Sequence, residues 1–223
     1  MTIFSSKIDR TYGYWRVHLM IAMYIGYAGF YLTRKSFNFA VPEMITALGI
    51  EKNDIGLMAT LFYITYGLSK FFSGIFSDKS NPRHFMAIGL IVTGILNIFF
   101  GLSNSVLFFT VLWVANAWFQ GWGWPACSKL LTSWYSRNER GHWWSVWNTA
   151  HNAGGALIPL LIGYVALHYS WRHGFAIAGG SAIFIGFSCY GDYVIHRSPW
   201  DYPVSGIGEM TNWNSSKNLL HPI

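Results

Sequence analysis

The sequence predicts an all-α membrane protein with six membrane-spanning helices. Hydrophobic residues make up 52% of the 223 residues and charged residues only 11%, against about 25% charged residues in soluble domains. The chain also carries 12 Trp, 13 Tyr and 17 Phe, which suits the aromatic belts at the two surfaces of a membrane. Apolar runs of roughly 20 residues, the length that crosses a bilayer as a helix, alternate with short polar segments.

The apolar runs define the order of the elements. After a cytoplasmic N-terminus of residues 1–16, we expect a six-helix transmembrane half-domain over residues 17–190, with spans at about 17–40, 55–77, 85–102, 106–128, 143–167 and 171–190. Each run ends where charged or small polar residues gather, as at Ser103-Asn104 between the third and fourth spans. The bilayer is therefore an expected partner along the whole half-domain.

The connecting segments predict the orientation of the chain. Basic residues gather before the first span, between the second and third, and between the fourth and fifth: Lys7, Arg10, Arg16, Lys79, Arg83, Lys129, Arg137 and Arg140. The remaining connections hold only Lys52 and Arg172. Because basic loops stay in the cytoplasm, this alternation predicts a cytoplasmic N-terminus. The same distribution excludes a nucleic-acid binder despite the net charge of +6, since the basic residues share no single face.

The first span contains a charged pair, Arg34-Lys35. A charge inside a span costs about 2.5–3.5 kcal/mol and usually marks a substrate or ion pathway. Tyr27 and Tyr31 precede Arg34 by seven and three residues, so a helix places them on the same face as the guanidinium. We therefore expect an anion site there. A structural arginine is the alternative, and Lys35 points about 100° away.

The second span repeats this pattern around Lys70. Tyr63 and Tyr66 precede Lys70 by seven and four residues, again on one helical face. An alternative is a lysine that extends its ammonium to the cytoplasmic interface, because Asp78 follows within about two turns.

The segment after the second span suggests a gating loop. Gly74 is followed by Asp78, Lys79 and Arg83 in the sequence GIFSDKSNPR. This resembles the cytoplasmic loop motif of the major facilitator superfamily. The resemblance implies that the glycine allows close helix approach and that the acid pairs with basic groups on neighbouring helices. The dipeptide Asn81-Pro82 departs from the family pattern, which usually has a glycine there.

Longer stretches resemble the organophosphate:phosphate antiporter family of that superfamily. They are YLTRKSFN from Tyr31, WFQGWGWP from Trp118, WYSRNERG from Trp134 and WNTAHNAGG from Trp147. Members include glycerol-3-phosphate and hexose-6-phosphate transporters and a hexose-phosphate sensor. The amino-acid sequence of these stretches is most similar to that of the sensor. The resemblance covers roughly residues 8–190. It implies a multi-pass protein of the bacterial inner membrane, built as half of a twelve-helix major facilitator fold.

The family also implies roles for individual residues. Arg34 matches the phosphate-binding arginine, whose planar fork of donors suits a phosphate. Lys70 and His151 match positions lining the same cavity, with Tyr27, Tyr31 and Tyr66 around them. Asn148 lies one helical turn before His151, so both can face inward. The alternative for His151 is interhelical packing. We interpret Trp118, Trp122 and Trp124 as interfacial anchors.

The final stretch, 191–223, resembles no span or family segment, and we expect it to be an out-of-frame tail. The codons for Trp200-Asp201-Tyr202, read one base earlier, permit Leu-Gly-Leu-Pro, which family members carry shortly after the sixth helix. In this interpretation the chain is the product of a truncated gene.

Two functions remain open for the sequence. A sensor would bind a hexose 6-phosphate and signal by contact with a membrane histidine kinase. A transporter would exchange hexose phosphate or glycerol phosphate for inorganic phosphate by rocking two halves around the site. An enzyme is disfavoured, and no cofactor is expected, because the spans show no metal-ligand cluster, nucleophile elbow or paired carboxylates.

Overall fold

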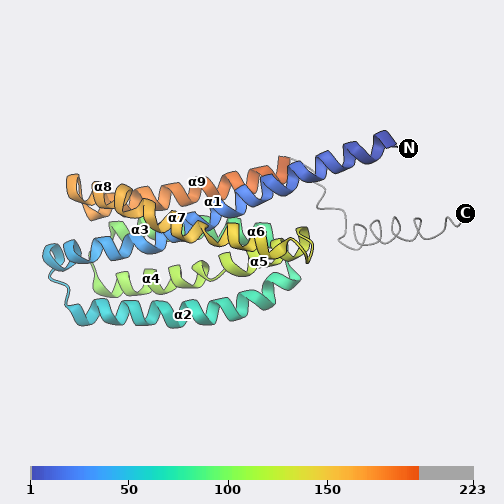
Figure 1. Cartoon of the computed structure of the whole chain (residues 1–223). Helices are drawn as coiled ribbons and strands as arrows, with labels where there is room; N and C mark the ends of the chain where they lie inside the picture. The colour runs from blue at the N-terminus through green and yellow to red at the C-terminus, as the bar shows by residue number, and fades with distance from the viewer. Residues whose placement is uncertain (1, 196–223) are drawn as a thin grey trace, which may run out of the picture.

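A computed structural model of the chain describes residues 2–195, apart from some side chains within that range, and this part is helical without strands (Figure 1). The all-α prediction is therefore confirmed. The elements in chain order are α1 (Thr2–Leu48), α2 (Lys52–Lys79), α3 (Pro82–Leu102), α4 (Val106–Gln120), α5 (Gly123–Trp134), α6 (Arg140–Asn148), α7 (Ala150–Ile158), the π-helix η1 (Pro159–Gly163), α8 (Tyr164–His168) and α9 (Trp171–Ile195). Most of the expected tail, residues 196–223, lies outside the described residues.

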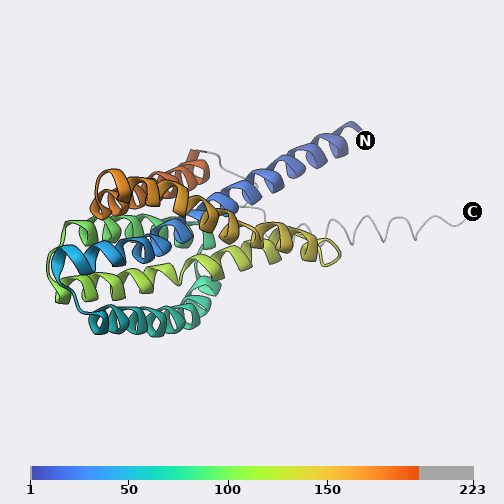
Figure 2. The ribbon, with the colours of Figure 1, turned by 60° about the vertical axis from the view of Figure 1, so that its left-hand side comes forward.

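The expected spans correspond to these elements with two differences. The helix α1 begins well before residue 17, and its first turns project beyond the other helices (Figures 1 and 2). The fourth and fifth spans are broken into α4–α5 and α6–α8. Three stretches, Lys52–Ser77, His84–Leu102 and Trp171–Gly191, are each long and apolar enough to cross a membrane by length and composition.

The break between α4 and α5 follows from Gly121 and Pro125. Proline has no backbone N–H, so Pro125 cannot donate to the Gly121 carbonyl one turn earlier. Ser73 of α2 supplies the missing donor, 3.1 Å from the Gly121 carbonyl oxygen. Ser69 donates in the same way to the carbonyl of Trp118. Because a freed carbonyl in an apolar bundle must be satisfied by protein, the break joins α2 to the α4–α5 segment.

The helices pack as a layered bundle around α1 and α3. The helix α3 lies between α9 and α4, and α4 in turn packs against α2. The helices α2 and α9 therefore occupy opposite sides of the bundle (Figures 1 and 2). The helix α1 packs against α9, α7 and α3. In this arrangement Arg34 of α1 reaches side chains of α2 and α4.

Polar contacts between helices stabilise both ends of the bundle. At the end with the α5–α6 connection, Arg16 forms an ion pair with Glu139 at 2.5 Å, and the hydroxyl of Tyr135 donates to the Arg16 carbonyl at 2.8 Å. At the opposite end, a carboxylate oxygen of Glu43 accepts from the backbone N–H of Trp171 at 3.0 Å. Glu43 thereby satisfies an orphan donor at the first turn of α9 and complements its dipole.

Candidate anion-binding site

The centre of the candidate site is the ring of Tyr66 on α2, which contacts two cations. The guanidinium carbon of Arg34 lies 4.2 Å from the ring centroid, and the ammonium of Lys70 lies 4.5 Å from it. The face of an aromatic ring attracts cations, and this attraction is stronger where water is excluded. Among the residues whose side chains the structure describes, no carboxylate forms an ion pair with either cation. Two like charges therefore converge on one ring.

Arg34 is also held on two other sides. Its guanidinium carbon lies 5.0 Å from the ring centroid of Tyr31, one turn earlier on α1. From α4, the side-chain oxygen of Gln120 accepts from Arg34 Nε at 3.3 Å and from Nη2 at 3.1 Å. Gln120 is only 2% exposed. Three helices thus fix the orientation of this guanidinium within the bundle.

The tyrosine face of α1 continues from Arg34 toward α6 and α7. The rings of Tyr27 and Tyr31 lie 5.5 Å apart, and the His151 ring lies 5.5 Å from Tyr31. Tyr27 also contacts Trp147, with 4.6 Å between ring centroids. The structure therefore places Tyr31 and Tyr66 against Arg34, and Tyr27 and His151 one ring further away, against Tyr31.

Asn148 lies apart from this group. Thr149 separates α6 from α7, but its backbone keeps right-handed helical angles, with φ −70° and ψ −16°, and its carbonyl accepts from the Ala153 N–H at 2.9 Å. The side chain of Asn148 is exposed, whereas the preceding Trp147 is fully buried against Tyr27. The expected inward face shared by Asn148 and His151 stays a prediction.

A glycine brings α7 close enough for the contact between His151 and Tyr31. A Cβ atom added at Gly154 would lie 3.0 Å from the carbonyl oxygen of Ala28 and 3.3 Å from the Cβ of Tyr31. A larger residue would push α7 away from α1. The glycine one turn after His151 therefore sets the distance between the two helices at the site.

Two residues near the cations, and a third against Tyr27, were not expected from sequence. Gln120 bonds Arg34 from 86 positions away, and Trp147 covers Tyr27. The Trp124 ring lies 5.7 Å from the Lys70 ammonium, so Trp124 is a neighbour of the site and not only an interfacial anchor. Tyr63 belongs to the same continuous helix α2 as Lys70 and is 63% exposed, and its place on the Lys70 face stays a prediction. The polar Gln120 within the apolar fourth run was the one available signal.

The expected gating loop occupies the end of α2 and the start of α3. Asp78 and Lys79 form the last residues of α2, and Arg83 lies in the first turn of α3. A Cβ added at Gly74 would meet no atom within 4 Å, so close helix approach at this glycine does not occur within the described residues. Instead, the Lys129 ammonium of α5 donates to the carbonyls of Ser77 and Ser80 at the end of α2.

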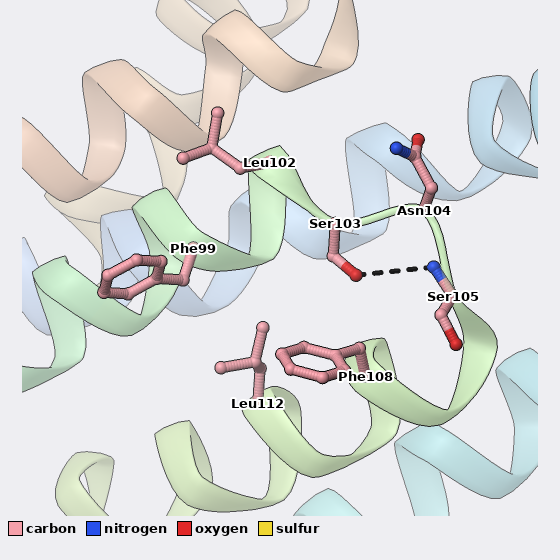
Figure 3. Close-up of a pocket in the computed structure, with 7 residues that line it drawn as sticks. All are labelled: Phe99, Leu102, Ser103, Asn104, Ser105, Phe108 and Leu112. Carbon is pink, nitrogen blue, oxygen red and sulfur yellow. Dashed lines mark hydrogen bonds between the residues drawn. The ribbon is translucent and has the colours of Figure 1, made fainter.

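A separate hollow lies at the connection between α3 and α4 (Figure 3). It is mostly apolar and is lined by Phe99, Leu102, Ser103, Asn104, Ser105, Phe108 and Leu112. The backbone N–H of Ser105 donates to the Ser103 hydroxyl at 3.4 Å, which closes this turn (Figure 3). None of the lining residues carries a charge, so the hollow offers no counterpart to the two cations around Tyr66.

The chain resembles a known protein family over most of its length. The model of the Major Facilitator Superfamily matches residues 23–199. The chain belongs to the Major Facilitator Superfamily. Members of this superfamily and the relatives below are transporters or sensors, so the chain is not classed as an enzyme.

Curated relatives confirm the resemblance to the sugar-phosphate branch of the superfamily. The chain is 62% identical over 185 residues to the membrane sensor protein UhpC of Escherichia coli, covering 82% of this chain and 42% of UhpC. It is 55% identical to a protein named "Probable hexose phosphate transport protein" of Chlamydia trachomatis, covering 81% and 40% of the two chains. It is 41% identical to the glycerol-3-phosphate transporter of Bacillus subtilis, covering 82% and 42%. The chain thus spans about two fifths of these relatives.

The fold comparison agrees with the family. A bacterial homologue of the human lysosomal transporter Spinster, in an inward-facing and occupied conformation, matches with a TM-score of 0.72 at 17% identity. The match covers 82% of this chain and 45% of the transporter. At this identity the likeness shows the fold, which is a half-length portion of a major facilitator bundle.

Proposed function

We propose that the chain forms the N-terminal half of a bacterial inner-membrane protein that binds a hexose 6-phosphate, with its N-terminus in the cytoplasm. Arg34 and Lys70 bind the phosphate group, and Tyr27, Tyr31 and His151 line the adjoining wall. The observation that carries the proposal is the placement of both cations on the single ring of Tyr66, at 4.2 and 4.5 Å.

A doubly charged phosphate ester fits this arrangement. Each cation within an apolar bundle costs free energy unless an anion or a functional pathway compensates it. A phosphate monoester carries between one and two negative charges near neutral pH and offers three acceptor oxygens. It can therefore bind both cations at once, while the aromatic rings support the charges from their other faces.

For the protein whose N-terminal half this chain forms, we favour the sensor role over transport. The 62% identity to UhpC exceeds the 55% identity to the chlamydial protein with a transport name. In the sensor role, the ligand-bound protein signals to a membrane histidine kinase. The alternative is antiport of hexose phosphate or glycerol phosphate against inorganic phosphate, which is supported by the same transport relatives. Ligand-dependent kinase activation without sugar-phosphate flux would identify a sensor, and coupled exchange in liposomes would identify an antiporter.

Binding itself is testable on the 223-residue chain in lipid nanodiscs. We expect the ³¹P NMR signal of glucose 6-phosphate to broaden and shift when the protein is added. The ¹H signals of unphosphorylated glucose should stay unchanged under the same conditions. The affinity should be weak, because relatives that extend over more than twice the matched length supply a further wall. Equal interaction with both sugars, or with neither, would reject the proposed phosphate site. The chain alone should not exchange phosphate in liposomes.

A further inference from the structure

We infer that Gln120 and Thr33 are positioning residues that aim the Arg34 guanidinium at the anion without compensating its charge. The inference rests on the proposed phosphate site and assigns a role to two buried residues outside it. Thr33 is fully buried at 0% exposure and Gln120 is 2% exposed. Neither is placed to contact the ligand as Lys70 and Arg34 are, so they act through Arg34.

The hydroxyl of Thr33 fixes the orientation of the Gln120 amide. Thr33 Oγ1 donates within its own helix, with the carbonyl oxygens of Phe30 at 3.0 Å and Gly29 at 3.3 Å as acceptors. A hydroxyl has one proton, so Thr33 Oγ1 can only accept from Gln120. The Gln120 Nε2 group lies 2.8 Å away and donates to it. The amide nitrogen therefore faces Thr33, and the amide oxygen necessarily faces Arg34.

This oxygen occupies one edge of the guanidinium. It accepts from Nε and Nη2 of Arg34, so the hydrogen bonds to Gln120 leave Nη1 unused. Tyr31 and Tyr66 contact the guanidinium at 5.0 and 4.2 Å. With one edge bonded and two rings against it, the group cannot rotate freely, and Nη1 is presented away from Gln120. A fixed fork of donors loses less conformational entropy when it binds phosphate.

The neutral amide also matters. A carboxylate at position 120 would accept the same two hydrogen bonds but would form an ion pair that neutralises Arg34. Such a pair would compete directly with an incoming anion. An amide supplies the same acceptor atom without the charge, so Arg34 stays positioned and has no competing counter-ion at this edge. Position 120 is therefore expected to tolerate an amide and to reject both an apolar and an acidic replacement.

The test separates geometry from charge with two measurements on the 223-residue chain in nanodiscs. Hydrogen exchange of the Arg34 Nε–H, observed by ¹⁵N NMR and assigned by its loss in Arg34→Lys, reports the bond to Gln120. Titration with inorganic phosphate, followed by ³¹P NMR, reports affinity. The variants are Gln120→Leu and Gln120→Glu, with Asn53→Glu as a control that adds the same charge at an exposed position of α2.

Gln120→Leu should speed Nε–H exchange and weaken phosphate binding, each by about tenfold. Gln120→Glu should keep the slow exchange yet weaken phosphate binding by more than about tenfold, and Asn53→Glu should match the wild type. Thr33→Val should weaken binding while Thr33→Ser, which keeps the hydroxyl, should not; this pair remains informative where a Gln120 variant fails to fold. Wild-type affinity in folded Gln120→Leu and Gln120→Glu would overturn the inference. Absence of binding of both inorganic phosphate and glucose 6-phosphate by the wild type would instead overturn the proposed function.

Discussion

Replacing Arg34 with lysine tests the proposed phosphate clamp while keeping its charge. Arg34 donates to Gln120 from Nε at 3.3 Å and from Nη2 at 3.1 Å, and it contacts the rings of Tyr31 and Tyr66. A lysine ammonium is a compact charge without the planar fork, so it cannot bond Gln120 through one edge and present parallel donors to phosphate from another. At least one hydrogen bond to a charged group is lost, about 1.5–3 kcal/mol.

This loss corresponds to roughly ten- to hundredfold weaker binding of glucose 6-phosphate, since about 1.4 kcal/mol equals a factor of ten. The measurement is a ³¹P NMR titration of Arg34→Lys in nanodiscs beside the wild type, with insertion checked by the helical circular dichroism signal. Lys35→Met is the matched control, because Lys35 lies about 100° around α1 from Arg34, and its affinity should change less than about threefold. Undiminished affinity in Arg34→Lys would show that Arg34 is not the clamp.

Further predictions concern the ends and the centre of the bundle. Glu43→Ala should destabilise the fold by about 1 kcal/mol, because the Trp171 N–H at the start of α9 loses its acceptor. The midpoint of thermal unfolding should fall, and an unchanged midpoint would contradict this prediction. Ser73→Ala should cost about 1–3 kcal/mol, because the carbonyl freed at the α4–α5 break is left unsatisfied, and denaturant unfolding in detergent measures it against Ser73→Thr. The hydrogen bond from Arg16 lowers the pKa of Glu139 from 4.5 to about 2, so the stabilisation is complete above about pH 4–5 and is lost as pH falls through 2. Arg16→Gln should return this pKa toward its ordinary value in a carboxyl ¹³C NMR titration, and a pKa that stays near 2 would assign the shift to another group.

The sequence alone determined the helical class, the order of the spans and the faces that carry the cations. Apolar runs of membrane length are readable because every residue in a bilayer core must be compatible with hydrocarbon and every backbone group must be bonded within a helix. Arg34 with Tyr31, and Lys70 with Tyr66, were readable because helical spacing of three or four residues places side chains together on one face. Both pairs are in contact in the structure.

Only the tertiary structure decided which faces meet. Periodicity defines the face of a single helix but not its rotation or depth against its neighbours, which depend on close packing at glycines such as Gly154. Thus Tyr66 reaches Arg34 as well as Lys70, and Gln120 reaches Arg34 across 86 positions. Consecutive residues also differ in burial, since Trp147 is fully buried against Tyr27 while Asn148 is exposed. Contacts between helices are not encoded in local spacing, because they arise from the steric fit of distant segments.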